Sequence, residues 1–346
     1  MLKVLIVLYI LLVFFTFFDY IKLVAKVKLS IAILLYFILA LICGLRFGDR
    51  DYGVYMASFD QAPNWGESAM NMEPNYRYLA YGFKMLGFSW EFFVLFFAFF
   101  SVGLMFLFLK KYTPFIFLAV LIYFSHAFIL RDMMQIRSSL AIGIVMFSIP
   151  YIENRNFLKT LFIVLFSGLF HFVGYFFIII YFLYPWFSIK RAIYVLLIGM
   201  IIGGVLNQTF FEYILEITNL QIIYYYLNDE LYNYNLGLLN PVLIKHILVI
   251  VVLLINYDFF KQKVPCFDVM ITSYLVAFFC LSAFNSFALL AGRIGTLFSN
   301  VEHVLIPSLF FLKYKRITLF LIIAYSFVAF HAKWEDLSLV QFVFDK

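Results

Sequence analysis

The sequence predicts an all-α, polytopic integral membrane protein, and two features of its composition support this class. Of 346 residues, 66% are hydrophobic and 13% are charged, whereas soluble domains carry roughly 25% charged residues. Long apolar stretches also recur along the whole chain, which is typical of membrane-spanning helices. No segment is long and polar enough for a separate soluble domain, so we expect residues 1–346 to form a single transmembrane bundle.

A spanning helix needs about 20 apolar residues, and the sequence offers about 12 such segments. They are residues 2–18, 29–45, 90–109, 113–130, 138–152, 157–170, 172–187, 192–206, 241–256, 268–290, 294–312 and 317–331. A single helix over 157–187 would be roughly 46 Å long, too long for a hydrocarbon core of about 30 Å even at the usual tilts. Two spans split at His171 would each be somewhat short, so length alone does not decide. The charges of the loops favour the split, and we expect two spans that meet at His171.

With this split, most lysines of the short loops fall on one side of the membrane, which the positive-inside rule makes cytoplasmic. The net charge of +6 is spread over these loops, so it predicts membrane orientation and not nucleic-acid binding. The opposite, periplasmic side then holds two long polar loops, at about 46–89 and 207–240, which are rich in tyrosine and asparagine.

Arginines also gather at the outer ends of the predicted spans. These are Arg46, Arg50, Arg77, Arg131, Arg137 and Arg293. The positive-inside rule does not explain cations on the outer side. Because the planar guanidinium can bind a phosphate or carboxylate through two bonds at once, these arginines indicate an anion site.

The first candidate stretch is the polar segment that follows the second predicted span. Its members are Arg46, Gly48, Asp49, Arg50, Asp51, Tyr52, Tyr55, Glu73, Pro74, Asn75, Tyr76 and Arg77. One interpretation is a set of loop ion pairs with tyrosines at the membrane interface. The other is a sugar-binding rim in which one carboxylate acts as a base.

The second candidate stretch is "ILRDMMQIRSSLA", residues 129–141. If a helix begins here, its free N–H groups and its dipole point outward beside Arg131 and Arg137, which would make an anion site. The alternative is a loop whose arginines pair with Asp132.

The third candidate is His171, which lies between Gly168 and Gly174 in apolar surroundings. A lone histidine on an apolar face is commonly a satisfied core residue. Here it falls where the chain must break, on the arginine side, and a histidine can take a proton from a hydroxyl group.

The fourth candidate is Arg293, between two apolar runs, with Glu302 and His303 deeper in the next span. A buried carboxylate at such depth needs a partner, and we expect Glu302 to pair with an arginine of another span in a structural role. The histidines and cysteines have no ligand spacing, so no metal site is indicated, and no cofactor-binding motif is present.

Four short elements together resemble the EpsG-like, Wzy-type polysaccharide polymerases. "LRFGDRDYGVY" resembles the R-x-x-G-x-D-Y-x-x-Y element, and "QIRSSLAIGI" resembles the I-R-Q-x-x-A element, with Ser138 where glutamine is common. "LFHFVGYF" resembles the following F-H element, and "AGRIGTLF" the late A-x-R-x-x-x-Y/F element. Their order and approximate spacing agree over about residues 30–312.

This resemblance implies a GT-C-like bundle in the bacterial inner membrane with its active site facing the periplasm. It implies a metal-independent, inverting glycosyltransferase that needs no cofactor. The enzyme would transfer a growing O-antigen or polysaccharide chain from undecaprenyl diphosphate to a hydroxyl of an incoming undecaprenyl-diphosphate-linked repeat unit. Donor, acceptor and membrane lipids are the expected partners, and a polysaccharide chain-length regulator is a further candidate.

Residue roles follow from that chemistry. The diphosphate leaving group would be bound by Arg131, Arg137 and Arg293, with support from Arg46, because fixed cations stabilise developing negative charge. His171 is the first candidate for the base and Asp51 the second. Glycan contacts would come from Tyr52, Tyr55, Glu73, Asn75 and Tyr76.

Three other functions stay open. One is a related lipid-linked sugar enzyme, such as an O-antigen ligase or a monosaccharide transferase. Another is a lipid-linked oligosaccharide flippase or other transporter, although transporters place charges near the membrane midplane and this chain places most of its arginines at one surface. The last is a subunit of an export complex that has no active site.

Overall fold

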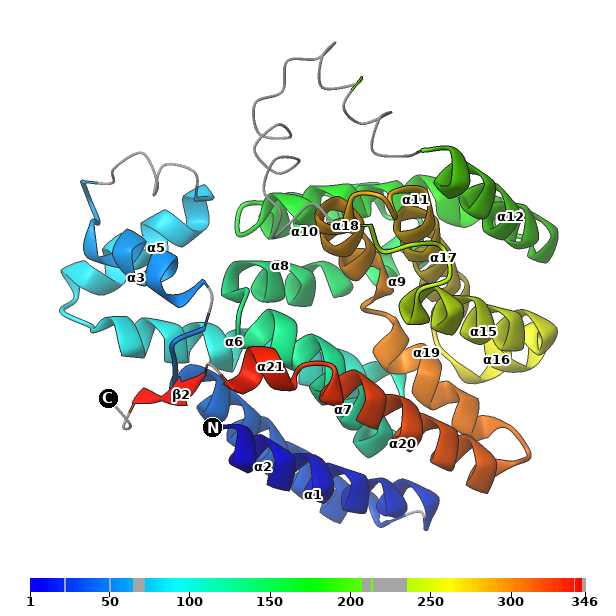
Figure 1. Cartoon of the computed structure of the whole chain (residues 1–346), viewed down its shortest axis with the longest axis horizontal. Helices are drawn as coiled ribbons and strands as arrows, with labels where there is room; N and C mark the ends of the chain where they lie inside the picture. The colour runs from blue at the N-terminus through cyan, green and yellow to red at the C-terminus, as the bar shows by residue number, and fades with distance from the viewer. Residues whose placement is uncertain are drawn as a thin grey trace. The chain divides into compact units, whose positions relative to one another are not determined.

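The described part of the chain is mostly helical, as the computed structural model in Figure 1 shows. The structure describes residues 1–21, 23–49, 51–64, 72–206, 213, 235–338 and 340–343. Arg50 and most of the predicted outer loop 207–240 therefore lie outside the described residues. In the described part, one short antiparallel sheet pairs β1 (Arg46–Phe47) with β2 (Gln341–Phe342).

Contacts between helices divide the chain into two compact units. The first comprises residues 1–148, 162–175 and 303–346, and the second comprises 149–161 and 176–302. Besides the sheet, the first holds α1 (Leu2–Tyr20), α2 (Ala25–Gly44), α3 (Tyr52–Asp60), α5 (Pro74–Met85), α6 (Trp90–Tyr112), α7 (Ile116–Tyr123), η1 (Phe124–Asp132), α8 (Ile136–Met146), η4 (Leu309–Phe311), α20 (Lys315–His331) and α21 (Trp334–Ser338).

The second unit holds α9 (Ile149–Glu153), α11 (Ile178–Leu183), η3 (Tyr184–Trp186), α12 (Ile189–Val205), α15 (Pro241–Ile255), α16 (Tyr257–Lys263), α17 (Phe267–Ala283) and α18 (Ala288–Ser299). Three helices have residues in both units: α10 (Phe157–Gly168), η2 (Phe172–Phe177) and α19 (Glu302–Ser308). Of the irregular helices, η1 is a π-helix and the other three are 3₁₀-helices.

The expectation of about 12 spans is not confirmed. Among the described residues, three helices are long and apolar enough to cross a membrane: α1, α2 and α6. The number rises to five if each of two bent helix pairs counts as one span, and one of these pairs, α15 with α16, bends by 88°. Several of the other apolar segments form shorter helices than the sequence predicts, among them α8, α10 and α17.

Local backbone geometry explains why these segments are short. The predicted span 138–152 breaks at residues 147–148, between α8 and α9, because Pro150 in the first turn of α9 has no N–H to continue the hydrogen-bond ladder to Met146. The predicted span 113–130 changes from an α-helix to the π-helix η1 at Phe124. Apolar composition therefore located these helices, whereas their ends depend on local breaks.

The predicted break within 157–187 is confirmed. Helix α10 ends at Gly168 and the next helical turn begins at Phe172. Both flanking glycines lie at close contacts: a Cβ on Gly168 would lie 2.1 Å from the Tyr175 ring, and one on Gly174 would lie 2.3 Å from Ser167 Oγ. The chain can reverse this sharply only where those side chains are missing.

The first unit packs α6 against α2 and α8, and α3 against α5. Aromatic side chains fill the core where α3, α5 and α6 meet. The buried aromatic residues of this cluster are Tyr52, Tyr55, Phe59, Tyr76, Trp90, Phe93, Phe97 and Phe170. Ile136 and Leu140 extend the same cluster to α8, so the core connects the start of α8 to the short helices α3 and α5.

A buried carboxylate holds the N-terminal hairpin onto the first unit. Asp19 Oδ2 accepts hydrogen bonds from the backbone N–H groups of Phe117 and Leu118, both at 2.9 Å. These are free donors of the first turn of α7, so Asp19 caps that helix from another segment. Lys28 of α2 forms an ion pair with Asp19, which ties α1, α2 and α7 together.

Helix α17 is the centre of the second unit and packs against α12, α15 and α18. Most of its residues are buried. Helix α12 approaches it through Gly199 and Gly203, where an added Cβ would lie 2.6 Å from Ser282 Oγ and 2.1 Å from Ser282 O. This spacing of small residues is the usual means of close helix packing in membranes.

Candidate active site

The candidate site is built around an ion pair between Arg137 and Glu73. Helix α8 begins at Ile136, which places Arg137 in its first turn. Glu73 is the N-cap residue of α5, directly before Pro74, and its side chain does not cap that helix. The side chains are 16% and 13% exposed, so two largely buried charges from distant parts of the first unit neutralise each other.

Glu73 also binds the turn that contains His171. The backbone N–H of Phe172 donates to Glu73 Oε1 at 3.2 Å. In the opposite direction, the backbone N–H of Asn75 donates to the Leu169 carbonyl at 3.1 Å. The break at residues 169–171 is therefore fastened to the first turn of α5, next to the Arg137–Glu73 pair.

The ring of His171 has a defined orientation in this turn. The backbone N–H of Val173 donates to His171 Nδ1 at 3.3 Å, and the ring stacks on Phe172 with centroids 5.1 Å apart. Because Nδ1 accepts a hydrogen bond, the neutral ring carries its proton on Nε2. The side chain is half-buried, and in this tautomer Nε2–H is a hydrogen-bond donor.

Two buried tyrosines support the guanidinium group of Arg137. It lies 5.3 Å from the Tyr55 ring centroid and 5.8 Å from that of Tyr76, within the range of a cation–π contact. Tyr76 Oη donates to the Tyr55 carbonyl at 3.0 Å. Burial raises the pKa of Tyr55, and the Arg137 charge opposes that rise. These rings thus hold the arginine in place.

The burial of the tyrosines bears on their expected contact with glycan. Tyr52, Tyr55 and Tyr76 are all buried in the aromatic cluster, and Tyr52 packs edge-on against Trp90 with centroids 5.5 Å apart. A sugar can stack only on an exposed ring face, so these rings are not open to it in this structure. Glu73 and Asn75 are partly exposed, and for them glycan contact stays a prediction.

Arg46 does not lie at an open anion site. Its side chain is 1% exposed; Nε donates to Asp49 Oδ2 at 3.1 Å, and Nη1 donates to the Cys43 carbonyl at 2.6 Å. Burial raises the pKa of Asp49, and the Arg46 charge opposes that rise. Binding a phosphate here would require breaking a buried ion pair, so the guanidinium of Arg46 has a structural role in this conformation.

The Arg46–Asp49 pair also positions Asp51. The other carboxylate oxygen of Asp49, Oδ1, accepts the backbone N–H of Asp51 at 3.1 Å. Asp51 then serves as the N-cap residue of α3, and its carbonyl accepts the N–H of Tyr55 at 3.1 Å. The hydrogen bonds of Asp49 thus fix the turn at the start of the first candidate stretch, and this turn sets where α3 begins.

Arg131 and Asp132 lie at the end of η1, close to the start of α8. Arg131 Nη1 donates to Gln135 Oε1. Asp132 is buried, and its carboxylate accepts hydrogen bonds from Tyr123 Oη at 2.7 Å and from Ser139 Oγ. The arginine that opens α8 pairs with Glu73, which lies far away in sequence. Of the two arginines that the loop alternative pairs with Asp132, Arg137 thus has a different partner.

Two further predicted residues lie in the second unit. Arg293 is half-buried on α18. Glu302 pairs with Lys245 of α15 and also accepts a hydrogen bond from Tyr274 Oη at 3.3 Å. A partner from another helix was expected for Glu302, but it is a lysine and not an arginine. The sequence did hold a signal for it, because Lys245 is a cation inside a predicted span.

The fold and the site define a multi-helix membrane protein that gathers charged groups where three chain segments meet. The family model for the EpsG family matches residues 29–343, and the chain belongs to that family. Amylovoran biosynthesis protein AmsC of Erwinia amylovora is 27% identical over 264 residues, which cover 72% of this chain and 68% of that protein. No solved structure matches the chain. The family resemblance seen in the sequence motifs is thus confirmed.

Proposed function

We propose that this protein is a polymerase of lipid-linked polysaccharide repeat units. It transfers the growing glycan from undecaprenyl diphosphate to a hydroxyl of an incoming lipid-linked unit, as a metal-independent, inverting glycosyltransferase with a GT-C-like bundle. Membership of the EpsG family and the relative named for amylovoran biosynthesis support this proposal. Three helices among the described residues are able to span a membrane, which supports a membrane location, and we propose the inner membrane with a periplasmic site.

One observation carries the proposal: three motifs predicted to be functional meet in one place. Arg137, Glu73 and the His171 turn come from separate stretches of the chain, and Glu73 binds the other two. A purely structural ion pair has no need of a histidine turn next to it. Charged groups and a histidine at a chain break are the elements that group transfer from a diphosphate requires.

Arg137 is the cation we propose for the diphosphate. When the bond from the anomeric carbon to the phosphate oxygen breaks, undecaprenyl diphosphate leaves with the electron pair and gains negative charge. The start of α8 adds the positive end of a helix dipole at the same point. Glu73 holds Arg137 until substrate arrives, and a diphosphate, which carries more charge, competes for the guanidinium. Arg131 and Arg293 are proposed to assist.

The acceptor hydroxyl attacks the anomeric carbon, and its proton passes to a base. The Nε2–H tautomer of His171 supports a donor role for that ring, which then hydrogen-bonds the departing phosphate oxygen. We therefore propose that Asp51, and not His171, is the base that accepts the proton of the acceptor hydroxyl. The Asp51 carbonyl accepts the N–H of Tyr55 at 3.1 Å, and the Tyr55 ring lies against the Arg137 guanidinium, which supports the nearness of Asp51 to the reacting groups.

The test is deletion of the gene, with the glycan ladder on a gel as the readout. If the protein is a polymerase, the deletion strain makes a single repeat unit on the lipid core, and the wild-type gene restores the ladder. Complete loss of repeat units would instead indicate a flippase or a ligase. An unchanged ladder would refute all of these roles.

The two candidate bases are separated by matched variants in the same strain. We expect Asp51→Asn to leave single units only, and His171→Gln, which keeps a side-chain donor, to retain a shortened ladder. If His171→Gln made single units only and Asp51→Asn kept a ladder, His171 would be the base.

A further inference from the structure

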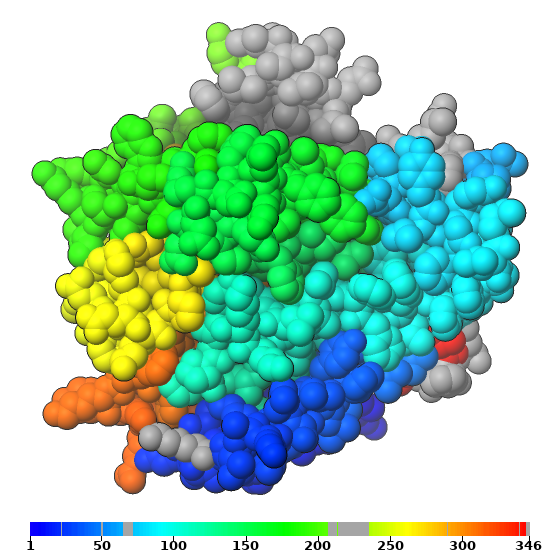
Figure 2. All heavy atoms as spheres, turned by 180° about the vertical axis from the view of Figure 1, so that it is seen from behind, coloured from blue at the N-terminus to red at the C-terminus, as the bar shows by residue number. Residues whose placement is uncertain are grey.

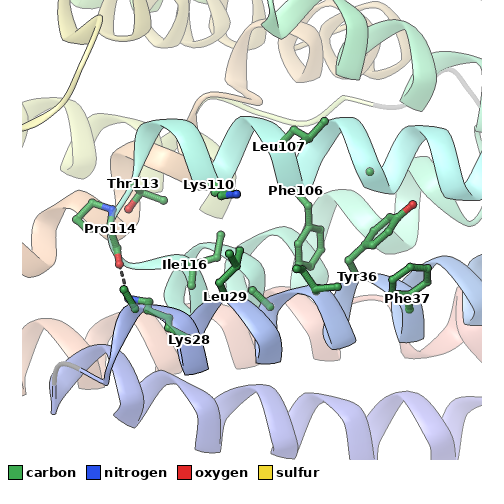
Figure 3. A pocket seen from close by; sticks show the side chains of 14 residues that line it. Lys28, Leu29, Tyr36, Phe37, Phe106, Leu107, Lys110, Thr113, Pro114 and Ile116 are labelled. Carbon is green, nitrogen blue, oxygen red and sulfur yellow. Dashed lines mark hydrogen bonds between the residues drawn. The ribbon is translucent and has the colours of Figure 1, made fainter.

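A lateral groove runs between α2 and α6 in the first unit, well apart in sequence from the residues of the candidate active site. Its cavity measures about 680 Å³. In Figure 3 the groove is walled by α2 on one side and α6 on the other, and its apolar lining includes Leu29, Ile33, Phe37, Phe106 and Leu107. From behind, in Figure 2, the surface of the N-terminal helices (blue) borders directly on that of the α6 region (cyan).

One end of this groove carries the lysines, and the rest is apolar apart from the Tyr36 hydroxyl, which donates to the Phe99 carbonyl at 3.1 Å. The polar end is formed by Lys28, Lys110 and Thr113, as Figure 3 shows. Lys28 bonds Asp19 and the Pro114 carbonyl, so its charge is already engaged. Lys110, in the last turn of α6, is exposed. The positive end of the α2 dipole lies at the same end, because α2 begins at Ala25.

The groove is open at the outer surface of the helices, where several of its apolar side chains are exposed. Leu107 is 56% exposed and Ile33 and Phe37 are each 46% exposed. In a membrane protein, such side chains on a long apolar helix contact lipid. An apolar trough with a cation at one end matches an amphiphile that has a hydrocarbon chain and an anionic head group.

The length of the groove identifies the kind of chain. Along α2, the distance from Lys28 to Phe37 is roughly 14 Å at about 1.5 Å per residue. Half of a hydrocarbon core of about 30 Å is about 15 Å. The groove therefore spans one leaflet, as a phospholipid acyl chain does, whereas an undecaprenyl chain is several times too long for it.

We propose that this groove binds an anionic phospholipid, with one acyl chain along α2 and α6 and the phosphate at Lys110. The lipid belongs to the leaflet on the side of the α1–α2 turn. It fills the space between two of the helices able to span a membrane, and the second unit takes no part in its binding.

The test measures binding of two lipids to the purified full-length protein in a neutral detergent. The probes are dioleoylphosphatidylglycerol, which is anionic, and dioleoylphosphatidylcholine, which is zwitterionic, and bound lipid is counted by native mass spectrometry. We expect tighter binding of the phosphatidylglycerol. Lys110→Gln should weaken it about fivefold, which corresponds to about 1 kcal/mol per lysine near a lipid head group.

Lys111→Gln is the matched control, because Lys111 is the adjacent lysine, lies over the Tyr112 ring and does not line the groove. It should leave lipid binding within twofold of the wild type. A second variant, Leu107→Trp, fills the groove from its exposed edge and should weaken binding of both lipids. Glycerol phosphate, a head group without chains, should not compete.

Three results would overturn the proposal. Equal binding of the two lipids would mean that no anion site exists. Equal effects of Lys110→Gln and Lys111→Gln would mean that only net charge matters. Unchanged binding in a folded Leu107→Trp protein would mean that the lipid lies elsewhere. Melting temperatures of all variants identify any that lose their fold. If a lysine variant is unfolded, Leu107→Trp still tests the site, because it changes no charge.

Discussion

Exchange of Arg137 for lysine separates the charge of this residue from the shape of its guanidinium. Lysine keeps the positive charge, and its side chain is long enough to reach Glu73, so the ion pair can survive. It loses the planar fork that binds two oxygens at once. It also loses the planar cation that lies over the Tyr55 and Tyr76 rings. We therefore expect Arg137→Lys to insert and fold but not to polymerise.

The expected magnitudes differ between stability and activity. A hydrogen bond to a charged group contributes about 1.5–3 kcal/mol, and lysine retains part of it, so the loss of stability should stay near 1 kcal/mol. Loss of a donor to a developing oxyanion costs about 2.7–4 kcal/mol, or 10²–10³ in rate. Activity should therefore fall far more than the melting temperature does.

The assay is the glycan ladder in the deletion strain, run beside a measurement of protein level in the membrane fraction. The chain offers a matched control in Arg155, whose guanidinium lies 3.9 Å from the Tyr181 ring centroid and donates to the Tyr181 carbonyl. Arg155→Lys makes the same change on a tyrosine outside the candidate site, and it should keep the full ladder.

Two outcomes would refute this reasoning. A normal ladder from Arg137→Lys would show that the fork is not needed. A normal ladder from the double variant Glu73→Arg with Arg137→Glu would show that the pair only holds the fold, because the swap restores the ion pair and reverses its direction.

Three further predictions concern stability. Arg46→Ala leaves the Asp49 carboxylate buried without its cation, so it should destabilise the fold by roughly 3–5 kcal/mol, measured as a lower melting temperature and a lower protein level. Gly44→Ala should destabilise the protein, because the new Cβ would lie 2.8 Å from a backbone atom of α6. In the matched variant Gly53→Ala the new Cβ meets nothing within 4 Å, so the protein should gain up to about 1 kcal/mol of stability from helix propensity. Equal melting temperatures of the two variants would contradict both expectations. Asp19→Ala removes the cap of α7 and should cost about 1–2 kcal/mol, whereas a cost below about 0.5 kcal/mol would show that Asp19 has no capping role.

Composition was enough to predict the helical membrane class, and hydropathy located the apolar helices, but it did not predict α3 and α5, which lie in the predicted outer loop 46–89. The number of spans could not be obtained in this way. Hydropathy does not sense where an α-helix changes to a π-helix, as at Phe124, or where a helix stops short of a proline, as α8 does at Met146 before Pro150. The break at His171 was predictable, because without it the basic loop residues from Lys190 onward would move to the opposite face of the membrane.

The site was predictable in its members but not in its pairings. Arg137 and His171 were identified by their motifs, and Glu73 was identified as one member of a polar rim. Nothing in the sequence shows that Glu73 bonds both of the others, because that contact depends on the tertiary fold. For the same reason the sequence did not separate Arg46, which is buried with Asp49, from the arginines at the helix ends.

The pairing of β1 with β2 has a consequence for biosynthesis. Leu45 receives a hydrogen bond from the backbone N–H of Val343, and Arg46 is paired with Phe342. The turn that carries Asp49 and Asp51 therefore acquires its last partner only after every helix has been translated and inserted. A premature stop after residue 338 and before residue 341 would leave the helices complete but remove β2, the strand that pairs with this turn. We expect such a product to accumulate in the membrane in an inactive form.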